Sequence, residues 1–141
     1  MAKECPPDII DLTLTAATIV HRNLGPGLLE SVYEAALAYE LRSVGIAVRT
    51  QVAFPVMYRG VDLGIGFRAD MIVAESLILE IKSLRAVDAS HVSQLLTYLR
   101  LGDMRIGFIL NFNHRLLKDG IKRVSLFSSP RDPRVPRGNF S

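Results

Sequence analysis

The segment SLILEIKSL, residues 76–84, decides the fold because it has the composition of an interior strand and yet carries two charges. Side chains alternate along a strand, so Glu80 and Lys82 share one face with Ile78, and the aliphatic residues between them share the other. Charged groups are costly to bury unless they are paired or bind a ligand. The segment therefore predicts a buried strand, and the two charges on one of its faces need an explanation.

Two helices are expected before this strand. The first starts at the Pro6-Pro7-Asp8 sequence and ends at the Gly-Pro-Gly sequence of residues 25–27. Its apolar stripe is Ile10, Leu14, Ala17, His21 and Leu24. The second is expected at about residues 28–44, with Gly45 at the stop position. It is apolar over most of its circumference and is expected to be buried outside one polar sector. That sector consists of Glu30, Ser31, Glu34 and Arg42.

Five strands and a third helix complete the pattern. The strands are expected at residues 48–58, 63–73, 77–82, 105–112 and 121–127. Pro55 predicts that the first strand is an edge strand or contains a bulge. The helix is expected at residues 88–101, with an inner stripe of Val92, Leu95, Leu96 and Leu99. It lies between the third and fourth strands, which predicts a parallel, right-handed crossover.

A hairpin between the second and third strands brings a third charged residue to the site. A loop of residues 74–76 pairs Val73 with Leu77, and the same register places Asp70 opposite Glu80. A slip of one residue moves Asp70 to the other face. Two adjacent carboxylates repel and burial adds to the cost, so one pKa is expected to be raised unless a cation neutralises them. Oxygen ligands suit a hard ion such as Mg²⁺.

A simpler interpretation competes with the metal site. Glu80 and Lys82 can form a cross-strand ion-pair set on a partly exposed sheet face, since most charge pairs in proteins are solvated. The aliphatic neighbours and the upstream Asp70 weaken this alternative but do not overturn it.

These residues resemble a known group of proteins. Asp70 followed by Glu80-Ile81-Lys82 is similar to the metal-binding signature of the PD-(D/E)XK nuclease superfamily. Within that superfamily, HRNLGPGLLESVYEAALAYEL (residues 21–41) resembles the GxxExxY protein family, whose motif is matched by Gly27, Glu30 and Tyr33. The segments QLLTYL, GFILNF and LKDGIKR extend the similarity over residues 9–125. Ala69 stands where the superfamily signature has proline.

The resemblance implies a fold and a set of roles. The fold is α/β, a restriction-endonuclease-like core (α-β-β-β-α-β) whose mixed central sheet is flanked by helices, with an extra N-terminal helix and a C-terminal strand. Mg²⁺ or Mn²⁺ is the implied cofactor and nucleic acid the implied partner. The implied metal ligands are Asp70, Glu80, the Ile81 carbonyl and Glu30. The implied catalytic residues are Lys82, Asp70, Glu80 and Gln94, with Gln94 facing the site from the third helix.

Composition limits the alternatives. The 141 residues suit one domain, residues 1–127, followed by a Pro/Arg-rich tail at 128–141 that is expected to be mobile. Of the net charge of +3, the tail carries +2, so the folded part is not strongly basic. Cys5 is the only cysteine, which excludes an intrachain disulfide and a thiolate zinc cage and favours a reducing cytoplasm.

Neither a membrane-spanning segment nor a bound nucleotide cofactor is expected. Residues 12–20 are too short and too rich in threonine to span a membrane. The glycine pattern of residues 64–69 precedes a strand, so no helix N-terminus is available for a nucleotide cofactor.

Three hypotheses remain from the sequence. The first is a metal-dependent nuclease-like enzyme that hydrolyses phosphodiester bonds in nucleic acid. The second is a catalytically silent module of nuclease fold that binds nucleic acid or a protein partner. A third is a homodimer in which the apolar second helix forms the contact.

Overall fold

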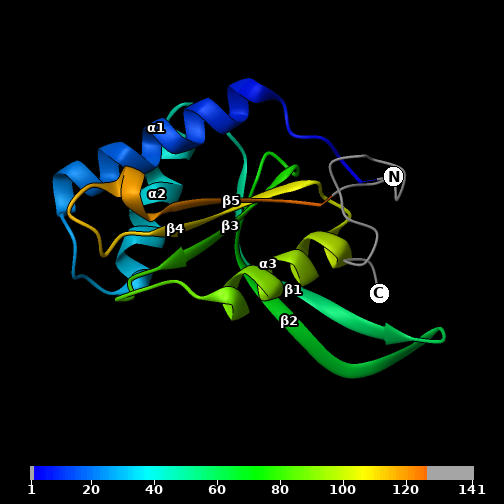
Figure 1. Cartoon of the computed structure of the whole chain (residues 1–141). Helices are drawn as coiled ribbons and strands as arrows, with labels where there is room; N and C mark the ends of the chain where they lie inside the picture. Colours follow the sequence, from blue (N-terminus) through cyan, green and yellow to red (C-terminus); the bar gives the residue numbers. More distant parts are fainter. Residues whose placement is uncertain (1, 127–141) are drawn as a thin grey trace, which may run out of the picture.

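The chain builds one mixed five-stranded sheet with helices on both faces (Figure 1). The computed structural model describes residues 2–126. The helices are α1 (Pro7–Leu24), α2 (Glu30–Ser43), α3 (Ala89–Gly102) and the 3₁₀ helix η1 (Leu117–Gly120). The strands are β1 (Val48–Tyr58), β2 (Val61–Val73), β3 (Leu77–Lys82), β4 (Ile106–Asn111) and β5 (Ile121–Ser125), in that order across the sheet.

The sheet topology is the predicted one. Strand β3 pairs with β4 in parallel, and α3 makes the connection between them, while every other neighbouring pair is antiparallel. This order of elements confirms the α-β-β-β-α-β core with an additional first helix and last strand.

The predicted register of the β2–β3 hairpin is confirmed. Val73 pairs with Leu77, and Met71 pairs with Leu79. The turn uses no glycine, although Ala74 and Glu75 have φ values of 50° and 51°. Both side-chain oxygens of Glu75 accept hydrogen bonds from Arg49 on β1, at 2.7 and 2.8 Å, and this pair supports the unusual turn.

Two hydrophobic clusters, one on each face of the sheet, confirm the predicted faces of β3. Leu77, Leu79 and Ile81 pack in the cluster that contains the buried side of α1 and α2. Ile78 packs in the cluster that contains α3. Because side chains alternate, Glu80 and Lys82 belong to the α3 face of the sheet.

The second helix differs from its prediction. It starts at Glu30 and ends at Ser43, and it is not buried outside its polar sector, since Tyr39 is 73% exposed and Val32 is also exposed. The reason is that α1 and the sheet cover only two of its sides. Leu24, predicted in the stripe of α1, is exposed because the helix ends there.

Strand lengths also differ in part. Strand β2 starts at Val61 rather than residue 63, and β4 and β5 are shorter than predicted. The predicted tail and residue 127 lie outside the described residues. No helix among residues 2–126 has the length and apolar composition needed to cross a membrane.

Pro55 predicted an edge strand or a bulge, and the structure has both. Strand β1 is an edge strand, and its register with β2 shifts between Pro55 and Met57. Beyond this point the two strands continue as a long hairpin that projects from the body of the molecule (Figure 1).

Candidate metal centre

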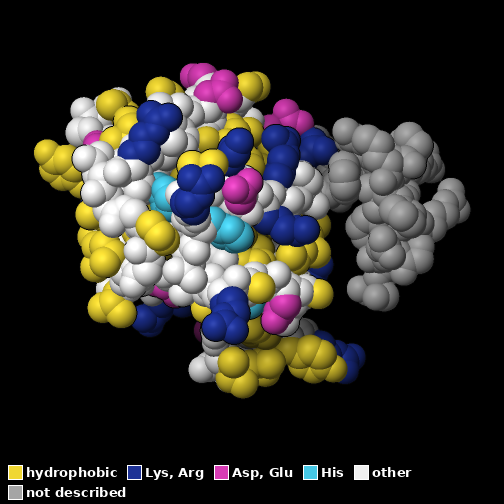
Figure 2. Space-filling model, turned by 60° about the vertical axis from the view of Figure 1, so that its left-hand side comes forward, with side chains coloured by type: hydrophobic (Ala, Val, Ile, Leu, Met, Phe, Trp, Pro, Cys, Tyr) yellow, Lys and Arg dark blue, Asp and Glu magenta, His cyan; other side chains and the backbone are white. Residues whose placement is uncertain are grey.

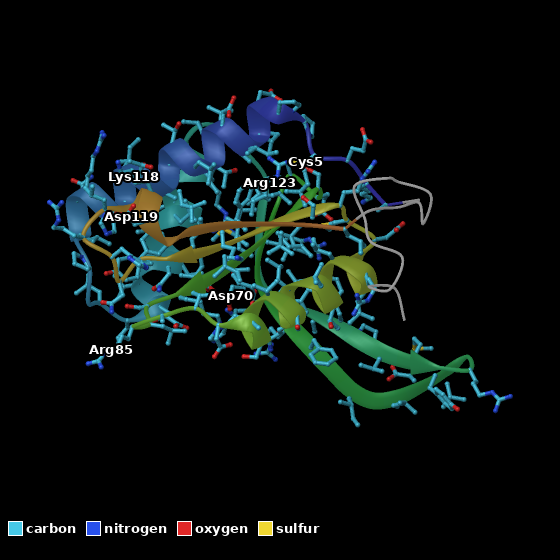
Figure 3. The ribbon with its side chains drawn as sticks, in the orientation of Figure 1. Cys5, Asp70, Arg85, Lys118, Asp119 and Arg123 are labelled. Atoms are coloured by element: carbon cyan, nitrogen blue, oxygen red, sulfur yellow. The ribbon has the colours of Figure 1, made fainter. Side chains whose placement is uncertain are left out.

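The candidate site lies where β2 and β3 separate. The Asp70 amide donates to Oε2 of Glu80 at 2.9 Å, and the Ile81 amide donates to Oδ2 of Asp70 at 2.8 Å. The last regular backbone pair of the hairpin is Met71 with Leu79. Beyond it, these two hydrogen bonds to carboxylates connect β2 and β3. One oxygen of each carboxylate is fixed in this way. Figure 3 shows Asp70 within the molecule, in contrast to Arg85 at its edge.

Glu30 joins this site from the first residue of α2. Its Oε2 accepts a hydrogen bond from the Ser83 amide at 3.0 Å, just after β3 ends. Its charge contributes to raising the pKa of both Asp70 and Glu80. Glu30, Asp70 and Glu80 are therefore close enough to interact.

The other two residues of the Gly-Glu-Tyr motif position Glu30. Tyr33 is fully buried, stacked on Phe112 with ring centroids 4.4 Å apart. Its hydroxyl donates to the Gly25 carbonyl at 2.5 Å and accepts from the Leu28 amide at 3.0 Å. Gly27 has φ of +91°, which glycine adopts readily. The motif therefore fixes the α1–α2 loop and with it the start of α2.

Burial dominates the electrostatics of the acidic pair. It raises the pKa of Glu80 to about 8, with the Asp70 charge as the second cause, although Lys82 lowers it. Burial also raises the pKa of Asp70, against the hydrogen bond from the Ile81 amide and the charge of Lys82. Glu80 is only 3% exposed. Without a cation, Glu80 is therefore mostly protonated at neutral pH.

Lys82 lies at the end of β3, half-buried, on the same face as Glu80. Within residues 2–126 the ion pairs are Arg49–Glu75, His91–Asp88 and Arg105–Glu4, so Lys82 takes part in none of them. The predicted alternative, a cross-strand ion-pair set on an exposed face, does not describe this geometry, because Glu80 is buried and bonded to backbone.

Two residues near the site were not predicted. Gln51 of β1 has φ of 52°, in the left-handed region, and its side-chain amide donates to Oε1 of Glu34 at 2.6 Å. The same amide lies 3.4 Å from Oδ1 of Asp70. Burial raises the pKa of Glu34, and the charge of Asp70 adds to this effect. Glu34 follows Glu30 by one helical turn, and this spacing is the sequence signal that points to it.

Two residues of α3 differ in their relation to the site. Gln94 is exposed and makes no hydrogen bond to the site among the described residues, so its role stays a prediction. Tyr98, one turn later, is buried. Burial raises the pKa of its phenol, and the charges of Glu80 and Asp70 contribute to the same direction.

The donor set decides whether a metal fits. Among residues 2–126, no three His, Cys, Asp or Glu side chains come together in a way that could hold a metal ion. Mg²⁺, however, is usually bound through one or two carboxylates and retains several waters. Backbone amides hold one oxygen of each acid, and the remaining ones are Oε1 of Glu80 and Oδ1 of Asp70, of which Oδ1 has the long 3.4 Å contact from Gln51. The donor chemistry therefore fits a hard divalent cation.

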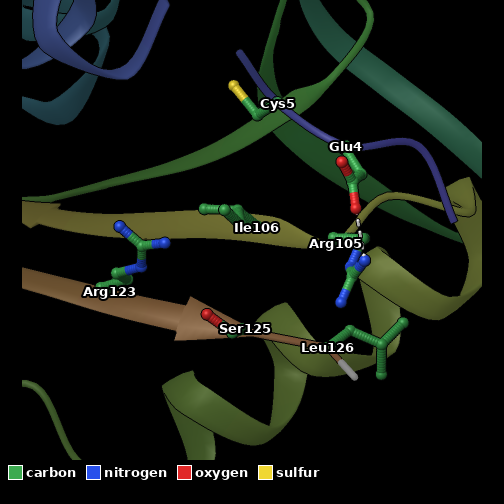
Figure 4. Close-up of a pocket in the computed structure, with 7 residues that line it drawn as sticks. All are labelled: Glu4, Cys5, Arg105, Ile106, Arg123, Ser125 and Leu126. Carbon is green, nitrogen blue, oxygen red and sulfur yellow. Dashed lines mark hydrogen bonds and ion pairs between the residues drawn. The ribbon is translucent and has the colours of Figure 1, made fainter. Parts of the chain in front are cut away.

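A separate pocket of about 220 Å³ lies at the other end of the β3–β4 pair (Figure 4). It is lined by Glu4, Cys5, Arg105, Ile106, Arg123, Ser125 and Leu126. Arg105 is already paired with Glu4 at 2.7 Å, and burial raises the pKa of the Cys5 thiol. This pocket shares no residue with the acidic site.

The fold and the acidic pair define an α/β domain of the restriction-endonuclease-like class. The sequence model of the PD-(D/E)XK nuclease superfamily matches residues 7–124, and the chain belongs to that superfamily. Neither the curated proteins nor the solved structures contain a match to the chain.

Proposed function

We propose that this protein is a divalent-metal-dependent nuclease of the GxxExxY family that hydrolyses phosphodiester bonds in nucleic acid. One observation carries the proposal. Glu80 accepts a hydrogen bond from the Asp70 amide and Asp70 accepts one from the Ile81 amide, so backbone amides hold the two carboxylates together, and the charge of Lys82 acts on both. Superfamily membership supports a nuclease-like function for this arrangement.

The roles follow from the chemistry of each group. Asp70 and Glu80 would hold Mg²⁺ or Mn²⁺, with the Ile81 carbonyl as a further ligand. Glu30 forms no three-acid cluster with them in this structure, so it would join as a ligand only if its side chain moved toward the cation. The cation would supply Lewis-acid activation of the phosphodiester and of a water molecule. Lys82 would stabilise the negative charge that develops on the phosphate or orient the attacking water. Gln94 and Tyr98 would contact this face of the sheet from α3.

The surface next to the site supports nucleic acid as the partner. A pocket of about 300 Å³ at this end of the sheet has Arg85, His114 and Lys122 in its lining, against one acidic residue, Asp119. Arg85 follows Lys82 by three residues, so the Cα atoms of these two residues are at most about 11 Å apart. Lys and Arg side chains are spread over the face in Figure 2, with His side chains among them. The cytoplasmic setting that goes with this proposal rests on the sequence alone, which has a single cysteine.

The proposal is tested by cleavage. Purified protein is incubated with single-stranded, double-stranded and structured DNA and RNA, each with Mg²⁺, with Mn²⁺ or with EDTA. We expect metal-dependent cleavage by the wild type and none by the Asp70→Asn/Glu80→Gln double variant. Glu75→Gln, on the exposed β2–β3 turn, is the matched control and should cut like the wild type. Wild type that cuts none of these substrates, and binds no metal, contradicts the proposal.

A silent binding module is the second candidate. It is supported by the raised pKa of Glu80, which leaves a protonated acid at neutral pH, and by the absence of a three-group metal cluster among residues 2–126. It predicts that nucleic-acid affinity persists in the Asp70→Asn/Glu80→Gln variant without metal. Loss of binding in that variant argues against it.

The basic pocket gives a prediction about affinity. Arg85→Ala should weaken binding of short duplexes similarly for all sequences, and should reduce the slope of log K against log salt by about 1, because one phosphate contact is lost. Fluorescence anisotropy over a salt series measures this slope. Arg100→Ala, an exposed arginine on α3, is the control and should leave the slope unchanged. Equal slopes for all three proteins would exclude a phosphate contact at Arg85.

A further inference from the structure

The hairpin that projects from the body, residues 54–67, is called the arm below. Its two strands pair in a defined way: Phe54 with Phe67, Pro55 with Gly66, and Tyr58 with Val61. In Figure 1 it extends beyond α3, away from the rest of the sheet. The arm is therefore packed against other elements only at its base, around Phe54 and Phe67, which is called its root.

The arm has one apolar face and one face with few large side chains. Paired residues share a face, and faces alternate along each strand. The register shift does not change which residues share a face, because Pro55 pairs with Gly66 before the shift and Met57 pairs with Asp62 after it. The apolar face carries Phe54, Val56, Tyr58, Val61, Leu63, Ile65 and Phe67. The opposite face carries Pro55, Met57, Asp62, Gly64 and Gly66.

Helix α3 covers this apolar face at the root only. Tyr98 contacts both Phe54 and Phe67, with ring centroids 6.4 and 5.9 Å apart. Gly102 lies directly against the Phe54 ring, so a Cβ there would come within 3.1 Å of it. The apolar face thus continues from the α3 core outward, past the end of the helix.

Beyond α3 the face is exposed. Tyr58, Val61, Leu63 and Ile65 are 60%, 59%, 47% and 64% exposed. Figure 2 shows hydrophobic side chains crowding the lower end of the molecule, where the arm protrudes. Contiguous apolar patches of this kind on soluble proteins mark interaction sites.

The chemistry of the arm selects its partner. Its only charged residues are Arg59 and Asp62, which cancel, so it lacks the Lys and Arg that dominate binding to nucleic-acid phosphates. The free edge of β1 is also a poor template for another strand, because Pro55 and the register shift interrupt it. An occupant must therefore be apolar and must pack on the face of the arm.

We infer that the arm is the dimerisation surface of this protein, and that its occupant is the arm of a second copy. The same face on both chains is self-complementary about a two-fold axis. Two sheets packed face to face lie about 10 Å apart and interdigitate their side chains. Four large exposed side chains from each of two copies amount to on the order of 1,000 Å² of buried surface, the lower bound for a stable interface.

Sedimentation velocity over a concentration series tests the dimer with the full chain. The wild type should form a dimer whose dissociation constant rises at least tenfold in Val61→Thr/Leu63→Thr/Ile65→Thr, substitutions that retain strand propensity. Met57→Thr alters an exposed residue of the opposite face and should leave the constant unchanged. Tyr39→Ser tests α2 as the contact and should also have no effect. A monomeric wild type, an unaffected triple variant or a monomeric Tyr39→Ser protein overturns the inference.

A crosslinking experiment tests the geometry independently of folding stability. Cys5 is buried and the chain has no other cysteine, so one introduced thiol reports on its own position. Leu63→Cys should give a disulfide-linked dimer under mild oxidation, because the middle of the apolar face lies near the two-fold axis. Met57→Cys should not. Equal yields from both positions overturn the face assignment. Protection of Leu63→Cys by an oligonucleotide at protein concentrations that give monomer would instead assign the arm to nucleic acid.

Discussion

The Lys82→Ala variant is expected to lower metal-dependent cleavage by roughly 10²–10³-fold, the usual effect of removing one group that stabilises transition-state charge. Lys82 is on the face of Glu80, and it forms no ion pair among the described residues. Its ammonium is therefore available for a substrate phosphate. Single-turnover rates under saturating Mg²⁺ measure the loss.

A loss of cleavage in Lys82→Ala must be separated from a loss of metal binding. Lys82 lowers the pKa of both Asp70 and Glu80, so its removal keeps these acids protonated to higher pH and weakens cation binding at neutral pH. The comparison is therefore made at pH 9, above the pKa of about 8 that Glu80 has in the wild type, and calorimetry measures the metal affinity of both proteins so that rates are compared at equal metal occupancy. A Lys82→Ala protein that cuts at the wild-type rate under these conditions contradicts the catalytic role. The Arg85→Lys variant, which keeps a positive charge at the next basic position, should leave the rate of chemistry unchanged.

The sequence was sufficient to predict the central geometry. The strict alternation in residues 77–82 sets the faces of β3. The assumed three-residue loop gave the β2–β3 register that the structure confirms, and this register placed Asp70 near Glu80. These are local rules: a period of two and a short turn. The Gly-Glu-Tyr motif pointed to Glu30 through resemblance, and the structure gives its physical basis in the hydrogen bonds of Tyr33.

The features that could not be predicted depend on contacts between residues far apart in the sequence. Gln51 reaches Asp70 only because β1 pairs with β2 in one register, and the irregular pairing near Pro55 hides that register from sequence. The exposure of Tyr39 and of the arm depends on which sides neighbouring elements leave uncovered. Apolar patterning identifies a face that can be buried, but it does not identify what covers it.

Glu80→Gln is expected to stabilise the metal-free protein at alkaline pH. The folded-state pKa of Glu80 is about 8 against an ordinary value of 4.5, so folding favours the protonated form. In the wild type, the favourable contribution is complete below pH 4.5 and is lost as the pH rises to about 8. At about 1.36 kcal/mol per pKa unit the loss is on the order of 3–5 kcal/mol, which the glutamine avoids. Thermal melts from about pH 4 to pH 9 in EDTA measure the difference, which corresponds to on the order of 10 °C.

The same melts with Mg²⁺ separate a ligand from a buried acid. At pH 8–9 a cation at roughly 100 times its dissociation constant stabilises the wild type by about 2.7 kcal/mol, and Glu80→Gln should lose this gain. Glu75→Gln is the control, with the opposite expected effect on stability. Arg49 holds the pKa of Glu75 below its usual range, so this variant should lose a little stability near neutral pH. It should gain from Mg²⁺ as much as the wild type does. If Glu80→Gln and the wild type gain equally from Mg²⁺, then Glu80 is not a ligand, and its raised pKa reflects burial alone.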